Sequence, residues 1–213
     1  MNTLLRFLFF AVLVRAVVLI WLGLNVRHRE RLPEDGPAII AANHNSHLDT
    51  MTLMSLFPLK LLPKLRPVAA ADYFDTGGFW GWFAKNIIGI IPVKRGSGKE
   101  GSNPLEPCER ALDRGEILII FPEGSRGEPE AMQAFKKGIG HLATARRKVP
   151  VVPVFMYGLG KAMPKGSGLI LPVNCTVSVG EPLYGKSSYD AFVKELEASM
   201  TALAKQEKLP EWE

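Results

Sequence analysis

The sequence predicts an α/β fold with a mixed, largely parallel central sheet flanked by helices, together with an N-terminal membrane-anchoring helix. Three observations lead to this interpretation. Short apolar runs alternate with longer mixed segments from Leu32 onward, which is typical of layered α/β domains. The stretch from Thr3 to Leu24 is apolar apart from two arginines. The 213 residues are enough for one domain with a substantial hydrophobic core.

The N-terminal segment is long enough to cross a bilayer. As a helix, Thr3 to Leu24 measures roughly 33 Å, against about 30 Å for the hydrocarbon core. Arg15 near its centre costs about 3 kcal/mol on insertion scales, and each Leu, Ile, Phe or Val of the segment returns about 0.3–0.6 kcal/mol. Because Arg6 and Arg15 fall on opposite faces of a regular helix, a helix lying on the membrane surface is disfavoured. A helix buried in the core is disfavoured as well, because it would have to bury an arginine.

A basic flank follows this segment and suggests how the chain is oriented. The arginines between Arg27 and Arg31 favour a cytoplasmic location for the residues that come after them. We see no small-residue cleavage site typical of a signal peptide. The sequence therefore predicts a membrane anchor with its basic flank at residues 1–31, spanning or re-entrant, and a domain at residues 32–213.

The remaining elements follow from short runs rich in Val and Ile, bounded by Gly and Pro, and from the mixed segments between them. Strands are expected at residues 37–42, 67–71, 87–93, 116–121 and 149–155, with one or two more within 168–179. Helices are expected at residues 47–56, 73–85, 105–114, 131–146 and 189–205. The last helix carries apolar residues along one face, so we expect it to pack on the domain. They are Phe192, Leu196, Met200 and Leu203.

A histidine and an aspartate follow the first strand of the domain. The strand runs into NHNSHLD at residues 43–49, where α/β folds often place catalytic groups. On one continuous helix, His44 and Asp49 are separated by about 140°. They meet only if His44 lies in the loop and Asp49 in the first turns of the following helix.

Such a pair lacks only the serine of a Ser-His-Asp arrangement. With a substrate that brings its own hydroxyl, His44 can act as general base, while Asp49 fixes the imidazole tautomer and stabilises the imidazolium. Other interpretations stay open on these residues alone. They are a hydrogen-bonded turn histidine beside a helix-start acid, His47 as the base, and a metal site.

Three further motifs follow in order along the chain. They are GIIPVKR at residues 89–95, FPEGSRG at 121–127 and VPVVPV at 149–154, with FKKG at 135–138 before the last. Together with the His-x4-Asp motif, this series resembles the glycerolipid acyltransferase family, whose members include 1-acylglycerol-3-phosphate acyltransferases. The resemblance covers residues 39–154, and FPEGSRG is its most specific part.

The resemblance implies a role for each matching residue. His44 matches the catalytic base of the family and Asp49 its orienting partner. The other matching residues are assigned to binding of the acceptor or the acyl chain. They are Arg95, Glu123, Gly124, Arg126, Val152 and Pro153.

Elementary chemistry supports a phosphate site among these residues. Arg95 and Arg126 each offer a bidentate fork just after an apolar strand. Gly124 lets backbone N–H groups approach an anion. Where the family often has FIDR, this chain has PVKR, so Lys94 adds a second cation and the acceptor head group stays open. Lys136 is a further candidate for the same anion site, and Glu123 can hold a substrate hydroxyl or pair with an arginine.

The resulting hypothesis is an O-acyltransferase that moves a fatty acyl group from acyl-CoA or acyl-carrier protein to lysophosphatidate, making phosphatidate in phospholipid biosynthesis. No metal or cofactor is expected besides the acyl donor. The apolar run at residues 51–62 and the FWGWF sequence at 79–83 favour contact with lipid.

Alternatives to this hypothesis are another lysolipid or glycerol 3-phosphate as acceptor and, in a different class, a non-catalytic membrane lipid-binding protein. The net charge of +5 suits nucleic acid, an anionic membrane or a phosphorylated substrate, but no motif supports nucleic-acid binding. The absence of a G-x-S-x-G sequence argues against a serine hydrolase.

Overall fold

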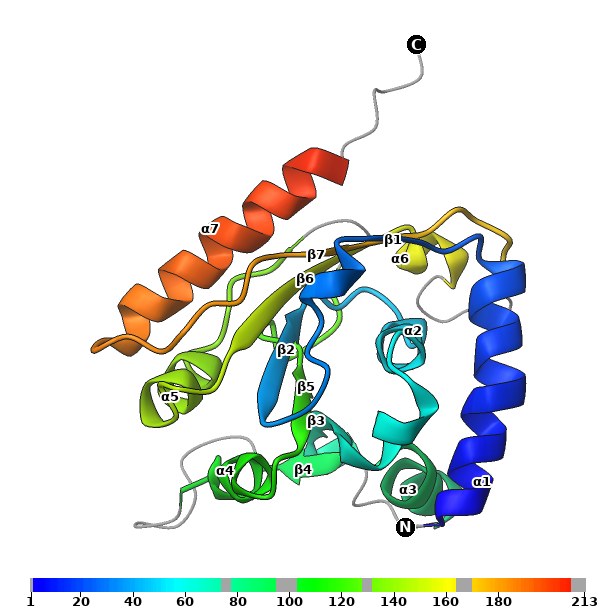
Figure 1. The fold of residues 1–213 in the computed structure, drawn as a ribbon, viewed down its shortest axis with the longest axis horizontal. Helices are drawn as coiled ribbons and strands as arrows, with labels where there is room; N and C mark the ends of the chain where they lie inside the picture. Colours follow the sequence, from blue (N-terminus) through cyan, green and yellow to red (C-terminus); the bar gives the residue numbers. More distant parts are fainter. Residues whose placement is uncertain (1, 74–77, 95–102, 128–131, 164–169, 208–213) are drawn as a thin grey trace.

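The structure is a computed structural model that describes residues 2–73, 78–94, 103–127, 132–163 and 170–207. It has three layers, with a twisted sheet between two groups of helices (Figure 1). The described residues form a seven-stranded sheet in the order β1-β7-β6-β2-β5-β3-β4. The strands are β1 (Asn25–Arg27), β2 (Ala38–Ala42), β3 (Leu65–Ala70), β4 (Ile91–Val93), β5 (Ile117–Ile120), β6 (Val151–Tyr157) and β7 (Thr176–Val179).

The strand directions make the sheet mixed and largely parallel, as the sequence predicts. Strands β2 to β6 run parallel to one another. Strand β7 is antiparallel to β6, and β1 pairs with β7 in parallel. The carboxyl ends of the five parallel strands therefore lie along one edge of the sheet, where their loops gather.

The central strand β2 shows why helices cover both faces. All five residues of its AIIAA sequence are buried. Ile40 belongs to the hydrophobic core on one face of the sheet, and Ile39 belongs to the core on the other. A strand that is apolar throughout, rather than alternating, fits a parallel sheet between two helical layers.

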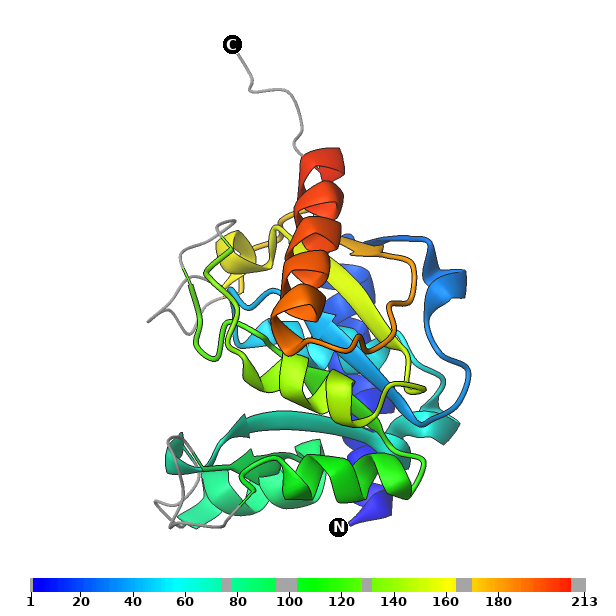
Figure 2. The ribbon, with the colours of Figure 1, turned by 90° about the vertical axis from the view of Figure 1, so that its left-hand side faces the viewer.

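Each face of the sheet has its own group of helices (Figures 1 and 2). One face is covered by the helix of residues 3–21, α2 (Leu48–Ser55) and α3 (Gly78–Phe83), which continues as the π-helical turn η6 (Ala84–Ile88). The other is covered by α4 (Glu106–Asp113), α5 (Gly138–Ala145) and α7 (Tyr189–Glu207), with the predicted apolar face of α7 buried. Shorter pieces are η3 (Arg29–Arg31), η4 (Leu59–Lys64), η5 (Ala71–Tyr73) and α6 (Leu159–Ala162).

The helix of residues 3–21 packs against the body of the protein. It consists of α1 (Thr3–Leu8) and two π-helical stretches, η1 (Phe9–Val14) and η2 (Val17–Trp21). One side of it, including Phe10, joins the same core as α2. Among the described residues, we find no helix whose length and apolar character would let it cross a membrane. The membrane anchor therefore stays a prediction.

Both arginines of this helix reach the protein body. The Arg6 side chain is buried, and its guanidinium donates to the backbone oxygens of Leu65 at 2.9 Å and Ile88 at 3.0 Å. Arg15 donates to the backbone oxygen of Phe57 at 3.3 Å. Opposite faces were predicted from the angle of a regular α-helix. The π-helical turns have more residues per turn, and both long side chains find carbonyl partners.

Two predicted elements differ from the structure, and one strand of the structure was not predicted. Of the strand expected at 87–93, only the last three residues are extended, because η6 continues to Ile88 and Gly89 ends it with a φ of +79°. The helix expected at 131–146 begins only at Gly138. Strand β1 was not expected, and it adds the segment predicted as an anchor to the same sheet as the rest of the chain.

Candidate active site

The candidate site lies at the carboxyl ends of two neighbouring strands, β2 and β5. After β2, the chain forms the loop of residues 43–47 and enters α2; after β5, it forms the loop of residues 121–127. The two loops are joined through the backbone, since the N–H of Gly127 donates to the carbonyl oxygen of His44 at 3.0 Å. Crevices at this end of a parallel sheet commonly hold ligands.

The structure brings His44 and Asp49 together, which confirms the predicted geometry. His44 lies in the loop and Asp49 in the first turn of α2, and His44 Nδ1 is 2.9 Å from Asp49 Oδ2. The same carboxylate oxygen accepts the backbone N–H groups of Asn45 at 2.7 Å and Ser46 at 2.8 Å. The carboxylate is fully buried and thus fixes both the loop and the imidazole.

One face of the imidazole is covered by an aromatic ring. Phe121 stacks on His44 with centroids 4.0 Å apart and planes 17° apart. The His44 side chain keeps 20% of its surface exposed, and its Nε2 has no hydrogen-bond partner among the described residues. With Nδ1–H donated to the carboxylate, Nε2 carries the lone pair and can accept a proton from a substrate.

Glu123 holds two backbone segments together, and the substrate-binding role expected from the sequence stays a prediction. Its Oε1 accepts the N–H of His44 at 2.9 Å, and its Oε2 accepts the N–H of Gln133 at 3.0 Å. The side chain is buried, and burial raises the pKa of its carboxyl group, against the lowering effect of both hydrogen bonds. Each carboxylate oxygen therefore accepts one backbone N–H group from a neighbouring segment.

Arg126 precedes Gly127, whose N–H binds the backbone of His44, and its side chain contacts a second histidine. Its guanidinium Nη1 forms a close hydrogen bond with His47 Nε2, at the start of α2. Partial desolvation, and then the charge of Arg126 and the proximity of His44, lower the pKa of His47, while Asp49 raises it. Within the described part of the chain, Arg126 has no carboxylate partner.

The structure describes two of the other three predicted cations. Lys94 is exposed just after β4, and Arg95 lies outside the described residues. Lys136 is brought to the FPEGSRG loop, where its backbone N–H donates to the oxygen of Pro122 at 2.8 Å. Its side chain lies over Gly124, which has a φ of +74° that favours glycine.

The Val-Pro motif lies in the sheet rather than in a loop. Val152 and Pro153 are buried in β6, opposite Ile40 and Ala41 of β2. Their place beside β2 supports the strand that carries the His44 loop. A role in shaping an acyl or acceptor site stays a prediction.

Two polar residues of the site were not predicted as functional. The Asn43 side chain clamps β2 to β6, because it accepts from the N–H of Met156 at 2.7 Å and donates to its oxygen at 2.9 Å. Ser46 Oγ accepts the N–H of Leu48, the first residue of α2, at 3.3 Å. The polar Asn43 directly after an apolar strand was a signal for such a clamp. Among the described residues, no group of three metal-ligating side chains comes together.

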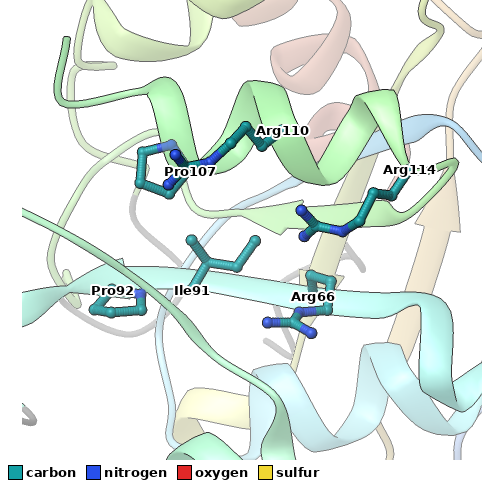
Figure 3. Close-up of a pocket in the computed structure, with 6 residues that line it drawn as sticks. All are labelled: Arg66, Ile91, Pro92, Pro107, Arg110 and Arg114. Atoms are coloured by element: carbon teal, nitrogen blue, oxygen red, sulfur yellow. The ribbon is translucent and has the colours of Figure 1, made fainter.

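A second hollow lies away from this site, at the amino ends of β3 and β4. Its volume is about 210 Å³, and it is lined by Arg66, Ile91, Pro92, Pro107, Arg110 and Arg114 (Figure 3). Glu116 accepts a hydrogen bond from Arg114 at 3.0 Å and lies 3.9 Å from Arg66. Glu106 pairs with Arg110 at 2.8 Å. Because each arginine has a glutamate partner, we assign this hollow no part in the chemistry.

A comparison with known families accounts for the four motifs together. The family model described as Acyltransferase matches residues 23–157, well over half of the chain. The chain belongs to the Acyltransferase family. The match spans the loops that carry His44, Asp49 and Arg126, so the site described above is the part of the chain that this family shares.

Curated relatives carry a more specific name. The chain is 34% identical over 172 residues to the chloroplastic 1-acyl-sn-glycerol-3-phosphate acyltransferase of Arabidopsis thaliana, covering 78% of this chain and 45% of that protein. It is 28% identical over 147 residues to 1-acyl-sn-glycerol-3-phosphate acyltransferase alpha of Mus musculus, covering 68% of this chain and 48% of that protein. The chain thus spans about half the length of the curated relatives it matches.

A solved structure shares the fold. The 1-acyl-sn-glycerophosphate acyltransferase PlsC of Thermotoga maritima matches with a TM-score of 0.77 at 22% identity, covering 99% of this chain and 81% of that one. This likeness extends over both helical layers and the sheet, and at this identity it shows the fold alone.

Proposed function

We propose that this member of the Acyltransferase family transfers a fatty acyl group from acyl-CoA or acyl-carrier protein to the hydroxyl of lysophosphatidate, forming phosphatidate. The observation that carries the proposal is the His44–Asp49 pair, in which His44 Nε2 has no partner among the described residues, together with the Arg126 guanidinium on the neighbouring loop. The names of the curated relatives support the same acceptor.

The chemical step follows from the orientation of the imidazole. His44 Nε2 accepts the proton of the acceptor hydroxyl as its oxygen attacks the carbonyl carbon of the thioester. The tetrahedral intermediate collapses when the C–S bond breaks, and the imidazolium returns its proton to the leaving thiolate. Asp49 stabilises the imidazolium between these two transfers. These steps need no metal or cofactor besides the acyl donor.

The acceptor is placed by its phosphate group. Arg126 offers a planar set of N–H donors close to His44, which suits a phosphate monoester next to the reacting hydroxyl. Lys136, over the same loop, adds a second positive charge. We assign Lys94 and Arg95, which follow β4, to the same anion.

The same domain is proposed to sit on the cytoplasmic face of a membrane. The outward side of the 3–21 helix exposes large apolar side chains, among them Ile20 at 82%, and α3 exposes Trp80 at 74%. The two helices touch through Phe9 and Phe83, whose ring centroids are 5.2 Å apart, so these apolar surfaces lie on neighbouring helices. Exposed Lys85 follows α3, and aromatic and Lys side chains together favour the head-group level.

Product analysis by mass spectrometry tests the activity. The full chain is given oleoyl-CoA or oleoyl-acyl-carrier protein with lysophosphatidate, lysophosphatidylcholine and glycerol 3-phosphate in one mixture. We expect phosphatidate as the main product. Its formation should be lost in His44→Ala and kept in the matched control His141→Ala, an exposed histidine of α5 that stacks on Tyr189. A different acylated product would show that the acceptor is another compound of the mixture. If no product forms with either donor, the proposal is wrong.

Flotation with anionic vesicles tests the membrane surface separately. The double variant Ile20→Ser, Trp80→Ser should float with the vesicles at least tenfold less than the unmodified chain, because two exposed apolar anchors are lost. Tyr184→Ser, which changes an exposed side chain elsewhere, is the control. Equal loss in the control, or none in the double variant, would contradict the proposed surface.

A further inference from the structure

His47 has no role in the proposed acyl transfer, but it contacts Arg126, which does have one. His47 lies at the start of α2, three residues after His44, and its Nε2 contacts Arg126 Nη1 from the neighbouring loop. Both residues are partly open to solvent, so the pair is at the mouth of the site rather than in the core.

The direction of this hydrogen bond fixes the chemical state of His47. A guanidinium has only N–H donors, so Nε2 must supply the lone pair and the proton of a neutral ring must be on Nδ1. A protonated imidazole would instead place two cations against each other. The groups that face His47 are Arg126, His44 and Asp49, and the first two favour its neutral form.

The pair restricts where the guanidinium can go. Arg126 belongs to a loop that is already tied to the site at two points, through Gly127 N–H to His44 and through the Glu123 carboxylate to the His44 N–H. The backbone of Arg126 is thus fixed relative to the catalytic base, while its long side chain retains several rotatable bonds. The contact with His47 removes that remaining freedom at one nitrogen and leaves the other N–H groups of the fork to a ligand.

We propose that His47 is a positioning residue for acceptor recognition, which holds the Arg126 guanidinium beside His44 so that its remaining N–H groups bind the phosphate monoester of the acceptor. This inference rests on the proposed function. A neutral imidazole nitrogen is suited to this task, because it accepts a hydrogen bond from the guanidinium and orients it without neutralising its charge. A carboxylate at the same place would compete with the phosphate.

Steady-state kinetics of the full chain with lysophosphatidate and oleoyl-CoA tests the role. His47→Ala should raise the KM for lysophosphatidate about tenfold, the size of one charged hydrogen bond in a half-exposed site, with kcat within about threefold and the KM for oleoyl-CoA unchanged. His47→Gln should restore KM to within about twofold, since the glutamine Oε1 can take the place of Nε2 as an acceptor. In an Arg126→Ala background, His47→Ala should have no further effect.

Nitrogen NMR of the imidazole tests the contact without any substrate. In the unmodified chain, His47 should show the Nδ1–H tautomer, and in Arg126→Ala it should show mixed tautomers and a higher pKa, because a neighbouring cation is gone. If the NMR result holds but KM does not change, or the two substitutions add independently, His47 is only structural and the inference is wrong. If the unmodified chain makes no phosphatidate, the proposed function fails while the NMR still reports the contact.

Discussion

Replacing Asp49 by asparagine removes the negative charge of the carboxylate while keeping a side chain of nearly the same shape. All three described donors, from His44, Asn45 and Ser46, meet the same oxygen, Oδ2, at 2.7–2.9 Å. An asparagine whose amide oxygen takes that position keeps every one of these contacts. Its NH2 group then occupies the place of Oδ1, which is buried and has no hydrogen-bond partner.

The geometry gives a magnitude for each effect. A carboxylate and an imidazolium about 4 Å apart attract by about 4 kcal/mol at an effective dielectric constant near 20, so losing the charge lowers kcat by about 10²–10³-fold. The orphaned NH2 lowers the free energy of unfolding by about 1–3 kcal/mol. Asp49→Ala instead leaves the N–H groups of Asn45 and Ser46 without an acceptor. This change should lower the free energy of unfolding by about 2–6 kcal/mol.

The assay combines kcat for lysophosphatidate acylation with urea unfolding of both variants. We expect Asp49→Asn to be slow but more stable than Asp49→Ala. If folded Asp49→Asn keeps more than a tenth of kcat, the charge does not assist the base. If the two variants unfold at the same urea concentration, the acceptor role of Oδ2 is not what holds the loop.

Three further predictions concern groups around the site and the layers that carry it. Arg6→Met should lower the free energy of unfolding by about 2–5 kcal/mol in urea titrations, because it removes the side-chain hydrogen bonds to two buried carbonyl groups, and an unchanged midpoint would contradict this. Gly140→Ala should destabilise by about 1–3 kcal/mol, since its Cβ would lie 2.7 Å from a backbone oxygen of α7, while Gly138→Ala on the same helix has room and should be neutral or stabilising. Because the pKa of Glu123 is raised in the folded state, the folded chain binds the extra proton between the ordinary glutamate pKa and the raised one, so stability falls as pH rises through this window. Glu123→Gln should remove that fall, and parallel pH profiles for the two proteins would refute the shift.

The catalytic pair could be predicted because it is local in the sequence. His44 and Asp49 lie five residues apart, after a strand whose apolar sequence is unmistakable, and only one loop-and-helix arrangement lets them meet. The order of strands and helices along the chain was predictable for the same reason, since each apolar run by itself indicates a buried segment. The helix expected from residue 131 failed at its start because residues 132–137 are held by contacts with the FPEGSRG loop, which periodicity does not record.

The partners of the charged residues could not be predicted because they are distant in the sequence. His47 and Arg126 are separated by 79 residues, and Glu123 reaches His44 over the same separation. A motif names the residue type that chemistry needs, but not which backbone group or ring it will contact. Strand β1 was missed because three residues with mixed exposure have no distinctive pattern, and the strand exists only through its pairing with β7.

The same long separations determine the order in which the chain can fold during synthesis. Arg6 must wait for Ile88, 82 residues later, which at 5–20 residues per second takes roughly 4–16 s. Strand β1 waits longer still, until Thr176 has been made. Until then, the side of the 3–21 helix that packs on the body of the protein is incompletely covered, and its outward apolar side is exposed. We expect a nearby membrane to shelter it, so that ribosomes translating this chain without lipid should yield more aggregate than those supplied with vesicles.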